Sequence, residues 1–534
     1  MKKQSLWALL ILCFSLSAIA QDPNAEKYAA QISIKHARKH LKVLASDKFE
    51  GRETGKRGAE MAAAYIAKEF KKLKLQAPVN GSYFQEVPLT ETTFEVSSLT
   101  TNGKTLTIGK DFLFNGSGGD RQISSTEIVF IGYGIGADSY DDLKNVNING
   151  KVVLMINKGE PMNNGVSAIS KTSTLSDWST NRFKRLQYVM SKSPALILSV
   201  NPDVEKALKS YTPTDGRLSV KKDNQAASGS RSGVAAQVNI SPETADLFLK
   251  KSGKSYEALK AAIDNSGTPQ SQILPAEVSI SYGPVRKDVK SVNVLGYLEG
   301  TDLKDELVVF SAHYDHIGIT ENGGPDKINN GADDDGSGTT GVLTIARAYA
   351  KAKKAGKGPR RSILFLLVTG EEKGLLGSEY YSLNPVFPLA NTVTNLNIDM
   401  IGRTGEEYKN SADSANYCYL IGSDKLSTDL HKISENANAT YTKMKIDYKY
   451  NDPKDPERIY YRSDHYNFAK HNIPIIFYFN GIHEDYHKPS DEVSKINFNL
   501  LTKRTQLVYY TGWDLVNRDK RPVVDVKNDM PSTR

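Results

Sequence analysis

Histidine and acidic residues lie after the ends of four short apolar segments in the C-terminal half of the sequence. The segments are 307–311, 362–368, 396–398 and 474–479, and after them come, in that order, His313 and Asp315, Glu371 and Glu372, Asp399, and His487. Imidazole and carboxylate groups bind metal ions and transfer protons. Their repeated position beside apolar segments therefore indicates a chemical site rather than scattered surface charge.

A glycine-rich turn adds three more carboxylates to this set. It reads Gly-Ala-Asp-Asp-Asp-Gly-Ser-Gly at 331–338 and precedes a predicted helix at 340–352. Clustered acids repel one another unless a cation neutralises them. Two histidines with several carboxylates suit zinc, and the excess of carboxylates suggests two ions that share a bridging Asp. In such a site one Glu of the pair Glu371 and Glu372 can bind metal while the other serves as a base.

The segments that must position these groups alternate between strand and helix from about residue 291 onward. This order predicts an α/β fold with a mostly parallel open sheet and flanking helices, whose strands deliver the polar groups to one rim of the sheet. Apolar spacing of three and four residues also predicts helices at 32–44 and 58–75. The turn between them contains Arg52, for which a substrate role is one possibility.

The region 119–285 has a different texture and is expected to form a separate, strand-rich domain. Short apolar runs occur at 128–131, 151–156, 195–200, 233–240 and 277–282, with turn residues between them. The segment 132–137 matches a dinucleotide-binding pattern, but no helical apolar period follows it. Nucleotide binding is therefore not expected there.

Residues 1–20 have the features of a secretory signal peptide, with two lysines, an apolar run at 6–16 and Ala-Ile-Ala at 18–20. We expect cleavage before Gln21 and export to the periplasm or the extracellular space, with no membrane span in the mature chain; an uncleaved anchor is the alternative. The net charge of +8, from 69 basic and 61 acidic residues, is spread along the chain and indicates no nucleic-acid partner. Because Cys13 lies in the signal, Cys418 would be left without a disulfide partner.

Five motifs together resemble those of the M28 family of co-catalytic zinc peptidases. They are His313-Tyr314-Asp315, Gly331-Ala332-Asp333-Asp334-Asp335-Gly336-Ser337-Gly338, Gly370-Glu371-Glu372, Asn397-Ile398-Asp399-Met400 and Tyr486-His487-Lys488-Pro489-Ser490-Asp491. The resemblance implies a peptidase domain at 21–118 and 286–517. Residues 518–534, which show no periodicity, are expected to form a polar tail. The resemblance also implies that 119–285 is similar to the protease-associated domain that many members carry.

The resemblance further implies a role for each site residue and two Zn²⁺ per chain. His313 and Asp399 would hold one zinc ion, Glu372 and His487 the other, and Asp334 would bridge them, with Glu371 as the general base, Asp315 orienting His313, and Asp335 fixing the loop at the helix start. The implied activity is that of an exported aminopeptidase, which hydrolyses the N-terminal residues of peptide substrates by means of a metal-bridging water.

Other functions stay open at this point. The first is a carboxypeptidase of the same fold, in which Arg458 or Arg462 would bind the substrate carboxylate. The others are a one-zinc glutaminyl cyclase, a metal-dependent phosphoesterase and a non-catalytic relative that binds peptides. His483 could replace His487 as a ligand, and His465 could be structural or functional. The oligomeric state is not predicted.

Overall fold

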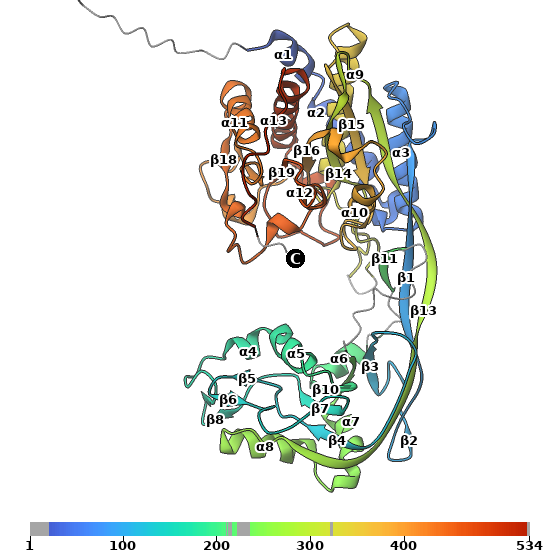
Figure 1. Cartoon of the computed structure of the whole chain (residues 1–534), viewed down its shortest axis with the longest axis vertical. Coiled ribbons are helices and arrows are strands. Elements are labelled where there is room, and N and C mark those ends of the chain that lie inside the picture. Colours follow the sequence, from blue (N-terminus) through green and yellow to red (C-terminus); the bar gives the residue numbers. More distant parts are fainter. Residues whose placement is uncertain (1–20, 210, 212–215, 222–234, 321–323, 531–534) are drawn as a thin grey trace, which may run out of the picture. The chain divides into compact units, whose positions relative to one another are not determined.

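The computed structural model describes residues 21–209, 211, 216–221, 235–320 and 324–530 (Figure 1). The expected signal peptide at 1–20 lies outside these residues. The chain folds into two compact units. Unit 1 comprises Met1–Pro88 and Lys290–Arg534, and unit 2 comprises Leu89–Val289.

The sheet of unit 1 has the strand order β18-β17-β19-β16-β14-β15-β13. The bounds of these strands are β13 Gln272–Leu298, β14 Leu303–His313, β15 Arg361–Val368, β16 Thr392–Ile398, β17 Tyr417–Ile421, β18 Lys445–Asp447 and β19 Ile475–Phe479. Strands β19, β16, β14 and β15 are parallel, whereas β13 and β17 run antiparallel to the neighbours β15 and β19. This arrangement confirms the predicted α/β fold with a mostly parallel sheet.

Both faces of this sheet are buried, which explains the continuous apolar run of β15. Ile363, Phe365 and Leu367 belong to one core and Leu364 and Leu366 to another, because successive side chains point to opposite faces. Helices α2, α3, α9 and α13 contribute to the first core, and α10 and α12 to the second (Figure 1). The helices of unit 1 are α1 Pro23–Ala29, α2 Ile34–Leu44, α3 Arg57–Lys72, α9 Gly336–Lys354, α10 Leu376–Leu383, α11 Thr428–Ala437, α12 His465–Ala469 and α13 Phe498–Asn517.

The hydrogen-bonded strands of unit 2 have the order β13-β4-β7-β10-β12-β3, and β13 is also the last strand in the order given for unit 1. The strands of unit 2, apart from β13, are β1 Phe84–Thr101, β2 Lys104–Thr105, β3 Phe112–Asn115, β4 Arg121–Phe130, β5 Gly136–Ala137, β6 Tyr140–Asp141, β7 Val152–Ile156, β8 Met162–Asn163, β9 Val166–Ser167, β10 Leu196–Val200, β11 Arg217–Val220 and β12 Ala236–Ile240. Its helices are α4 Asp177–Thr180, α5 Arg182–Met190, α6 Val204–Lys209, α7 Pro242–Leu249 and α8 Tyr256–Ser266. The dinucleotide-like segment leads into the hairpin of β5 and β6 instead of a helix.

Unit 2 starts at Leu89, earlier than the boundary at 119 that the sequence suggested. The reason is strand pairing: β3 pairs with β12, and β2 pairs with the end of β1. The segment 89–118 therefore packs with the insertion and not with the peptidase-like part of the chain.

The expected polar tail after residue 517 packs against unit 1 over its described part, 518–530. Asp525 accepts a hydrogen bond from the hydroxyl of Thr428 at 2.6 Å, and Asn528 donates to the Tyr460 hydroxyl at 2.9 Å. Met530 is buried in the second core. Among the described residues, no helix combines the length and apolar character that a membrane crossing requires.

Candidate metal centre

The carboxyl ends of the parallel strands bring the candidate residues to one place. His313 is the last residue of β14, Asp399 directly follows β16, and Glu371 and Glu372 lie in the turn after β15. Asp334 comes from the loop that leads into α9. The side chain of Asp335 accepts a hydrogen bond from the Gly338 N–H at 2.8 Å, so it caps this helix, as expected.

One group of potential ligands surrounds the His313 imidazole. Its Nε2 atom lies 3.3 Å from Asp334 Oδ1 and 3.6 Å from Asp399 Oδ1. This nitrogen is buried and forms no hydrogen bond within the protein. Ligands at about 2 Å from one tetrahedral zinc ion lie roughly 3.3 Å from each other, so these separations fit one ion.

A second group shares Asp334 with the first. His487 Nε2 lies 3.1 Å from Asp334 Oδ2 and 3.1 Å from Glu372 Oε2. The two carboxylate oxygens of Asp334 thus face different histidines. This is the arrangement that a bridging carboxylate between two ions requires.

The structure adds His316, which the sequence reasoning did not single out. Its Nδ1 lies 2.7 Å from Glu372 Oε1 and 3.9 Å from Asp334 Oδ2, and its Nε2 is buried without a hydrogen-bond partner. The imidazole therefore either orients Glu372 or contributes to the second group. Its position three residues after His313 was the available signal, because both follow the same strand.

The protein alone places strongly interacting charges at this site. Burial would lower the pKa of His313, but the carboxylates of Asp399 and Glu371 raise it well above its usual range. Burial would raise the pKa of Asp334, but His313 and His487 hold it well below its usual range. A bound cation would replace these protons as the source of positive charge. The donor set therefore fits a pair of zinc ions.

Glu371 stands beside the potential ligands. Its Oε2 lies 3.9 Å from His313 Nε2, which is the longest of the distances from that nitrogen to these carboxylates. Burial raises the pKa of Glu371 well above its usual range, and the carboxylates of Glu372 and Asp399 raise it further. Glu371 is consequently an acid that holds a proton more readily than an exposed glutamate does.

The contacts of Asp315 differ from the expected ones. The His313 Nδ1 lies 3.1 Å from the main-chain oxygen of Asp315 and 3.8 Å from its carboxylate. The carboxylate instead accepts hydrogen bonds from the Thr54 hydroxyl at 2.7 Å and from the Glu371 N–H at 3.3 Å. Asp315 thus fixes the turn that carries Glu371, while its carbonyl faces the imidazole.

A buried chain of hydrogen bonds leads to Asp399. The Asn397 side chain donates to Ser463 Oγ at 2.9 Å, and Ser463 donates to Asp399 Oδ2 at 2.6 Å. Asn397 in turn accepts from Ser311. The second oxygen of Asp399 is held in this way while the first faces His313.

The bridging loop is held from behind by another set of polar side chains. Asp491 Oδ2 accepts hydrogen bonds from the N–H groups of Asp333 and Asp334 at 2.9 and 3.1 Å. His483, the possible rival ligand, lies 3.1 Å from Asp333 Oδ2, and the other oxygen of Asp333 accepts from the Gly402 N–H. His483 therefore supports the loop through Asp333 instead of joining the ligands.

Arg52 does not face a substrate, because its guanidinium is fully buried. It donates to the main-chain oxygens of Tyr314, Leu44, Asn330 and Gly331 at 2.7–2.9 Å. Two of these carbonyls belong to the loop that carries Asp334, and one adjoins Asp315. Arg52 thus ties the N-terminal turn to both loops of the metal centre.

His465 is structural. Its ring stacks on Phe477, and its Nε2 lies 2.8 Å from the carbonyl oxygen of Tyr460. Burial lowers its pKa to about 3, so the ring is neutral.

Two adjoining pockets open at the metal centre, and both include Glu371, Arg462 and Tyr486. The first is a narrow cavity of about 30 Å³ and is otherwise lined by Asp334, Asp399, Met400, Ile459, Phe477, Phe479 and Ile482. The second is wider and is otherwise lined by Glu372, Gly374, Arg458 and Tyr461. The loop 457–468 thus contributes Arg458, Ile459, Tyr461 and Arg462 to these pockets.

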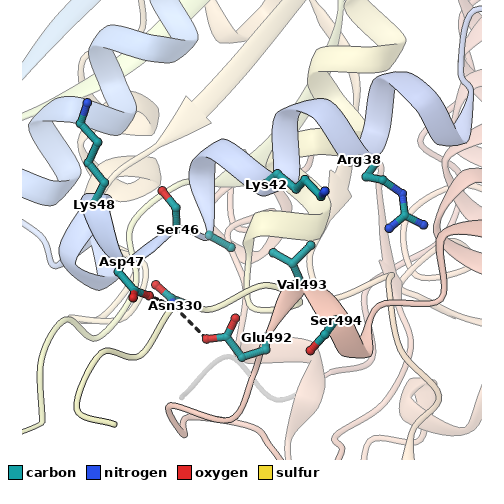
Figure 2. A pocket seen from close by; sticks show the side chains of 10 residues that line it. Arg38, Lys42, Ser46, Asp47, Lys48, Asn330, Glu492, Val493 and Ser494 are labelled. Atoms are coloured by element: carbon teal, nitrogen blue, oxygen red, sulfur yellow. Dashed lines mark hydrogen bonds between the residues drawn. The ribbon is translucent and has the colours of Figure 1, made fainter.

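A third pocket contains none of the candidate ligands. Figure 2 shows that Arg38, Lys42 and Asp47 line it together with Asn330 and Glu492. The Asn330 side-chain amide donates to Asp47 Oδ1 at 2.7 Å and to Glu492 Oε1 at 2.8 Å. Asn330 thereby connects the N-terminal turn to the start of the bridging loop and to the neighbour of Asp491.

Comparisons with known proteins show which family and fold this chain resembles. Residues 293–512 match the family model of peptidase family M28, which confirms the resemblance seen in the motifs. Aminopeptidase YwaD of Bacillus subtilis is 25% identical over 43% of this chain and 46% of its own length. Leucine aminopeptidase 2 of Trichophyton rubrum is 27% identical over 41% of this chain and 43% of its own.

Solved structures show the same fold. An aminopeptidase from Aneurinibacillus sp. strain AM-1 superposes with a TM-score of 0.55 at 17% identity, covering 96% of this chain and 100% of that one. BSAP, a zinc aminopeptidase from Bacillus subtilis, gives 0.51 at 19% identity, covering 93% and 99%. The chain spans between a tenth and about half of the length of the curated relatives that it matches.

Proposed function

The chain carries a peptidase family M28 domain at residues 293–512, and from this premise we propose that it is a di-zinc aminopeptidase. His313 and Asp399 would hold one ion, Glu372 and His487 the other, and Asp334 would bridge them. Zinc bound there would supply Lewis-acid polarisation of the peptide carbonyl and would lower the pKa of a water molecule.

Glu371 carries the proton in this proposal. It lies beside the ligand groups and lines both pockets, so it can reach a water and a substrate nitrogen in the same site. As general base it would take the proton of the attacking water, and as general acid it would return that proton to the leaving amine. Asp315 would position it through the hydrogen bond to the Glu371 N–H.

The observation that carries the proposal is the shared position of Asp334 between two histidines, with Glu371 to one side. Two ligand groups with one common carboxylate support two ions better than one, which disfavours the one-zinc cyclase. The match to peptidase family M28 disfavours a phosphoesterase. The complete donor set speaks against a non-catalytic peptide-binding relative.

Hydrolysis of leucine p-nitroanilide together with the zinc content per chain tests the function. We expect two zinc ions per chain and turnover that chelation abolishes. Glu371→Gln should keep both ions and lower kcat by about 10²–10⁴-fold, because the carboxylate no longer accepts a proton. Glu95→Gln, an exposed change in unit 2, is the matched control. Near-normal turnover of Glu371→Gln would remove the base from the mechanism.

A carboxypeptidase is the second candidate, favoured by the two arginines at the wider pocket, Arg458 and Arg462. It would hydrolyse N-acetylated dipeptides, whereas an aminopeptidase requires a free amine. Comparing Leu-Gly with acetyl-Leu-Gly separates the two activities. Unit 2 as a protease-associated domain and export through residues 1–20 also belong to this proposal, on the grounds of the sequence resemblance and the signal pattern.

A further inference from the structure

The two pockets at the metal centre differ in chemistry, and this difference bears on the substrate. Rings and aliphatic chains dominate the first, among them Met400, Ile459 and Phe477. The second is wider, and four of its seven lining residues are charged, namely Glu371, Glu372, Arg458 and Arg462. If the proposed function holds, the apolar pocket suits the side chain of the N-terminal residue, and Glu371 marks the scissile bond. The part of the peptide that leaves must then lie over the polar pocket.

Arg462 is held at the boundary of the two pockets by its neighbours. Its Nη2 donates to the Tyr486 hydroxyl at 3.1 Å, and its guanidinium lies 5.9 Å from the centre of the Tyr486 ring. Ser463, the next residue, donates to Asp399, and Tyr486 precedes His487 and stacks on it at 3.8 Å. Arg462 and Tyr486 are thus each next in sequence to a residue of the metal centre: Ser463 contacts a proposed ligand, and His487 is one.

The charge of Arg462 has no carboxylate partner within 4 Å among the residues that the structure describes. Its one recorded hydrogen-bond partner is the neutral hydroxyl of Tyr486, so other guanidinium donors can bind a ligand. By contrast, the nearby Lys373 is paired with Glu53 at 2.9 Å. A guanidinium with free donors and no ion-pair partner matches a carboxylate in both charge and geometry.

We propose that Arg462 is a specificity-determining residue that binds a carboxylate on the leaving group, on the residue that follows the scissile bond. Two sources supply this chemistry: the C-terminal carboxylate of a dipeptide, and an Asp or Glu side chain at that residue in a longer peptide. The enzyme would therefore favour dipeptides and peptides with an acidic second residue. This inference rests on the proposed peptidase function.

Matched pairs of peptides that differ only in the carboxylate test it. Leu-Gly is compared with Leu-Gly-amide for the terminal carboxylate, and Leu-Asp-amide with Leu-Asn-amide for the side chain, through kcat/KM at constant ionic strength. We expect the native enzyme to favour the carboxylate in at least one pair by about tenfold to hundredfold, the range of a hydrogen bond between charged groups. Arg462→Met should bring that ratio close to one, and Arg462→Lys should retain part of it. Arg121→Met, an exposed change in unit 2, should leave the ratio unchanged.

Zinc content and the thermal midpoint show that each variant is folded before its ratio is interpreted. A native ratio near one in both pairs overturns the inference, as does a ratio that survives Arg462→Met. A preference for glutamyl over leucyl p-nitroanilide that disappears in Arg462→Met also overturns it, because Arg462 would then serve the N-terminal side chain. No hydrolysis of leucine p-nitroanilide by the native zinc-loaded protein would overturn the proposed function itself, and this inference with it.

Discussion

Replacing Arg52 by Met should destabilise unit 1 and weaken the metal centre together. The substitution removes the donors to four buried carbonyl oxygens, those of Leu44, Tyr314, Asn330 and Gly331. Each carbonyl without a donor costs about 1–3 kcal/mol, while the Met side chain recovers part of this through apolar burial and through relief from desolvating a cation. The expected net loss is about 3–5 kcal/mol, which is the usual range when one partner of a buried charged interaction is removed.

The assay is thermal unfolding of the zinc-loaded and the chelator-treated protein. A loss of this size should lower the midpoint of unit 1 by roughly 5–10 °C. Because two of the four carbonyls lie at the start of the loop that carries Asp334, the variant should also lose zinc to a chelator more readily than the native protein. Arg52→Lys keeps the positive charge but has fewer hydrogen-bond donors. Its unfolding midpoint and its zinc retention should therefore lie between those of the native protein and those of Arg52→Met.

Arg57→Met is the matched control for this experiment. Arg57 lies five residues further along, its side chain is 72% exposed, and its ion-pair partner is Glu50 at 3.0 Å. An exposed pair of this kind contributes about 0–1 kcal/mol. If Arg52→Met unfolds at the same temperature as Arg57→Met and retains zinc equally well, the argument that Arg52 supports the metal centre is wrong.

Three further predictions follow from the site and its surroundings. Ser463→Ala removes the hydroxyl that donates to Asp399 and should weaken zinc binding by about 10–100-fold in a chelator competition; unchanged zinc affinity would rule out this orienting role. Asp491→Ala removes the acceptor for two N–H groups of the bridging loop. It should reduce zinc retention and lower the free energy of unfolding by about 2–4 kcal/mol. Chemical denaturation of the metal-free and the metal-loaded protein measures both effects. Burial lowers the pKa of His40 to about 4, so the unfolded chain binds a proton more readily, and the free energy of unfolding should fall by roughly 3 kcal/mol as the pH drops from about 6.5 to 4. His40→Asn should lose less stability over the same pH range, and equal slopes for both proteins would contradict the assignment.

The sequence was sufficient to predict that most of the proposed ligands lie close together, because they come at or after the ends of apolar strands. The run that became β15 is followed within three residues by Glu371, with Glu372 next to it, and the run within β14 is followed within two residues by His313. Parallel strands end at one edge of a sheet, so these positions could be brought together without knowledge of any distance. The strand cores themselves were recognisable from their unbroken apolar character.

Other features depend on contacts between distant segments and therefore could not be read from local pattern. His483 and His487 occur in one loop, yet Asp333 pairs with the first and Asp334 with the second. The start of unit 2 at Leu89 depends on the pairing of β3 with β12. A short strand such as β3 carries too little periodicity to reveal which domain it joins.

The role of Arg52 shows why the N-terminal segment belongs to the metal centre although unit 2 separates the two in the chain. The Tyr83 carbonyl accepts a hydrogen bond from the Leu295 N–H at 2.8 Å, so the chain leaves unit 1 and re-enters it through neighbouring strands. Unit 2 folds around its own cores, so it does not act as a long flexible loop between the two parts of unit 1. The entropy cost of bringing these two parts together therefore grows little with the length of unit 2. The hydrogen bonds from Arg52 and Thr54 can therefore form as if the two parts of unit 1 were close in sequence. An insertion at this point leaves the metal centre intact, whereas removal of the segment that carries Arg52 and Thr54 would take away the hydrogen bonds that this segment gives to both loops.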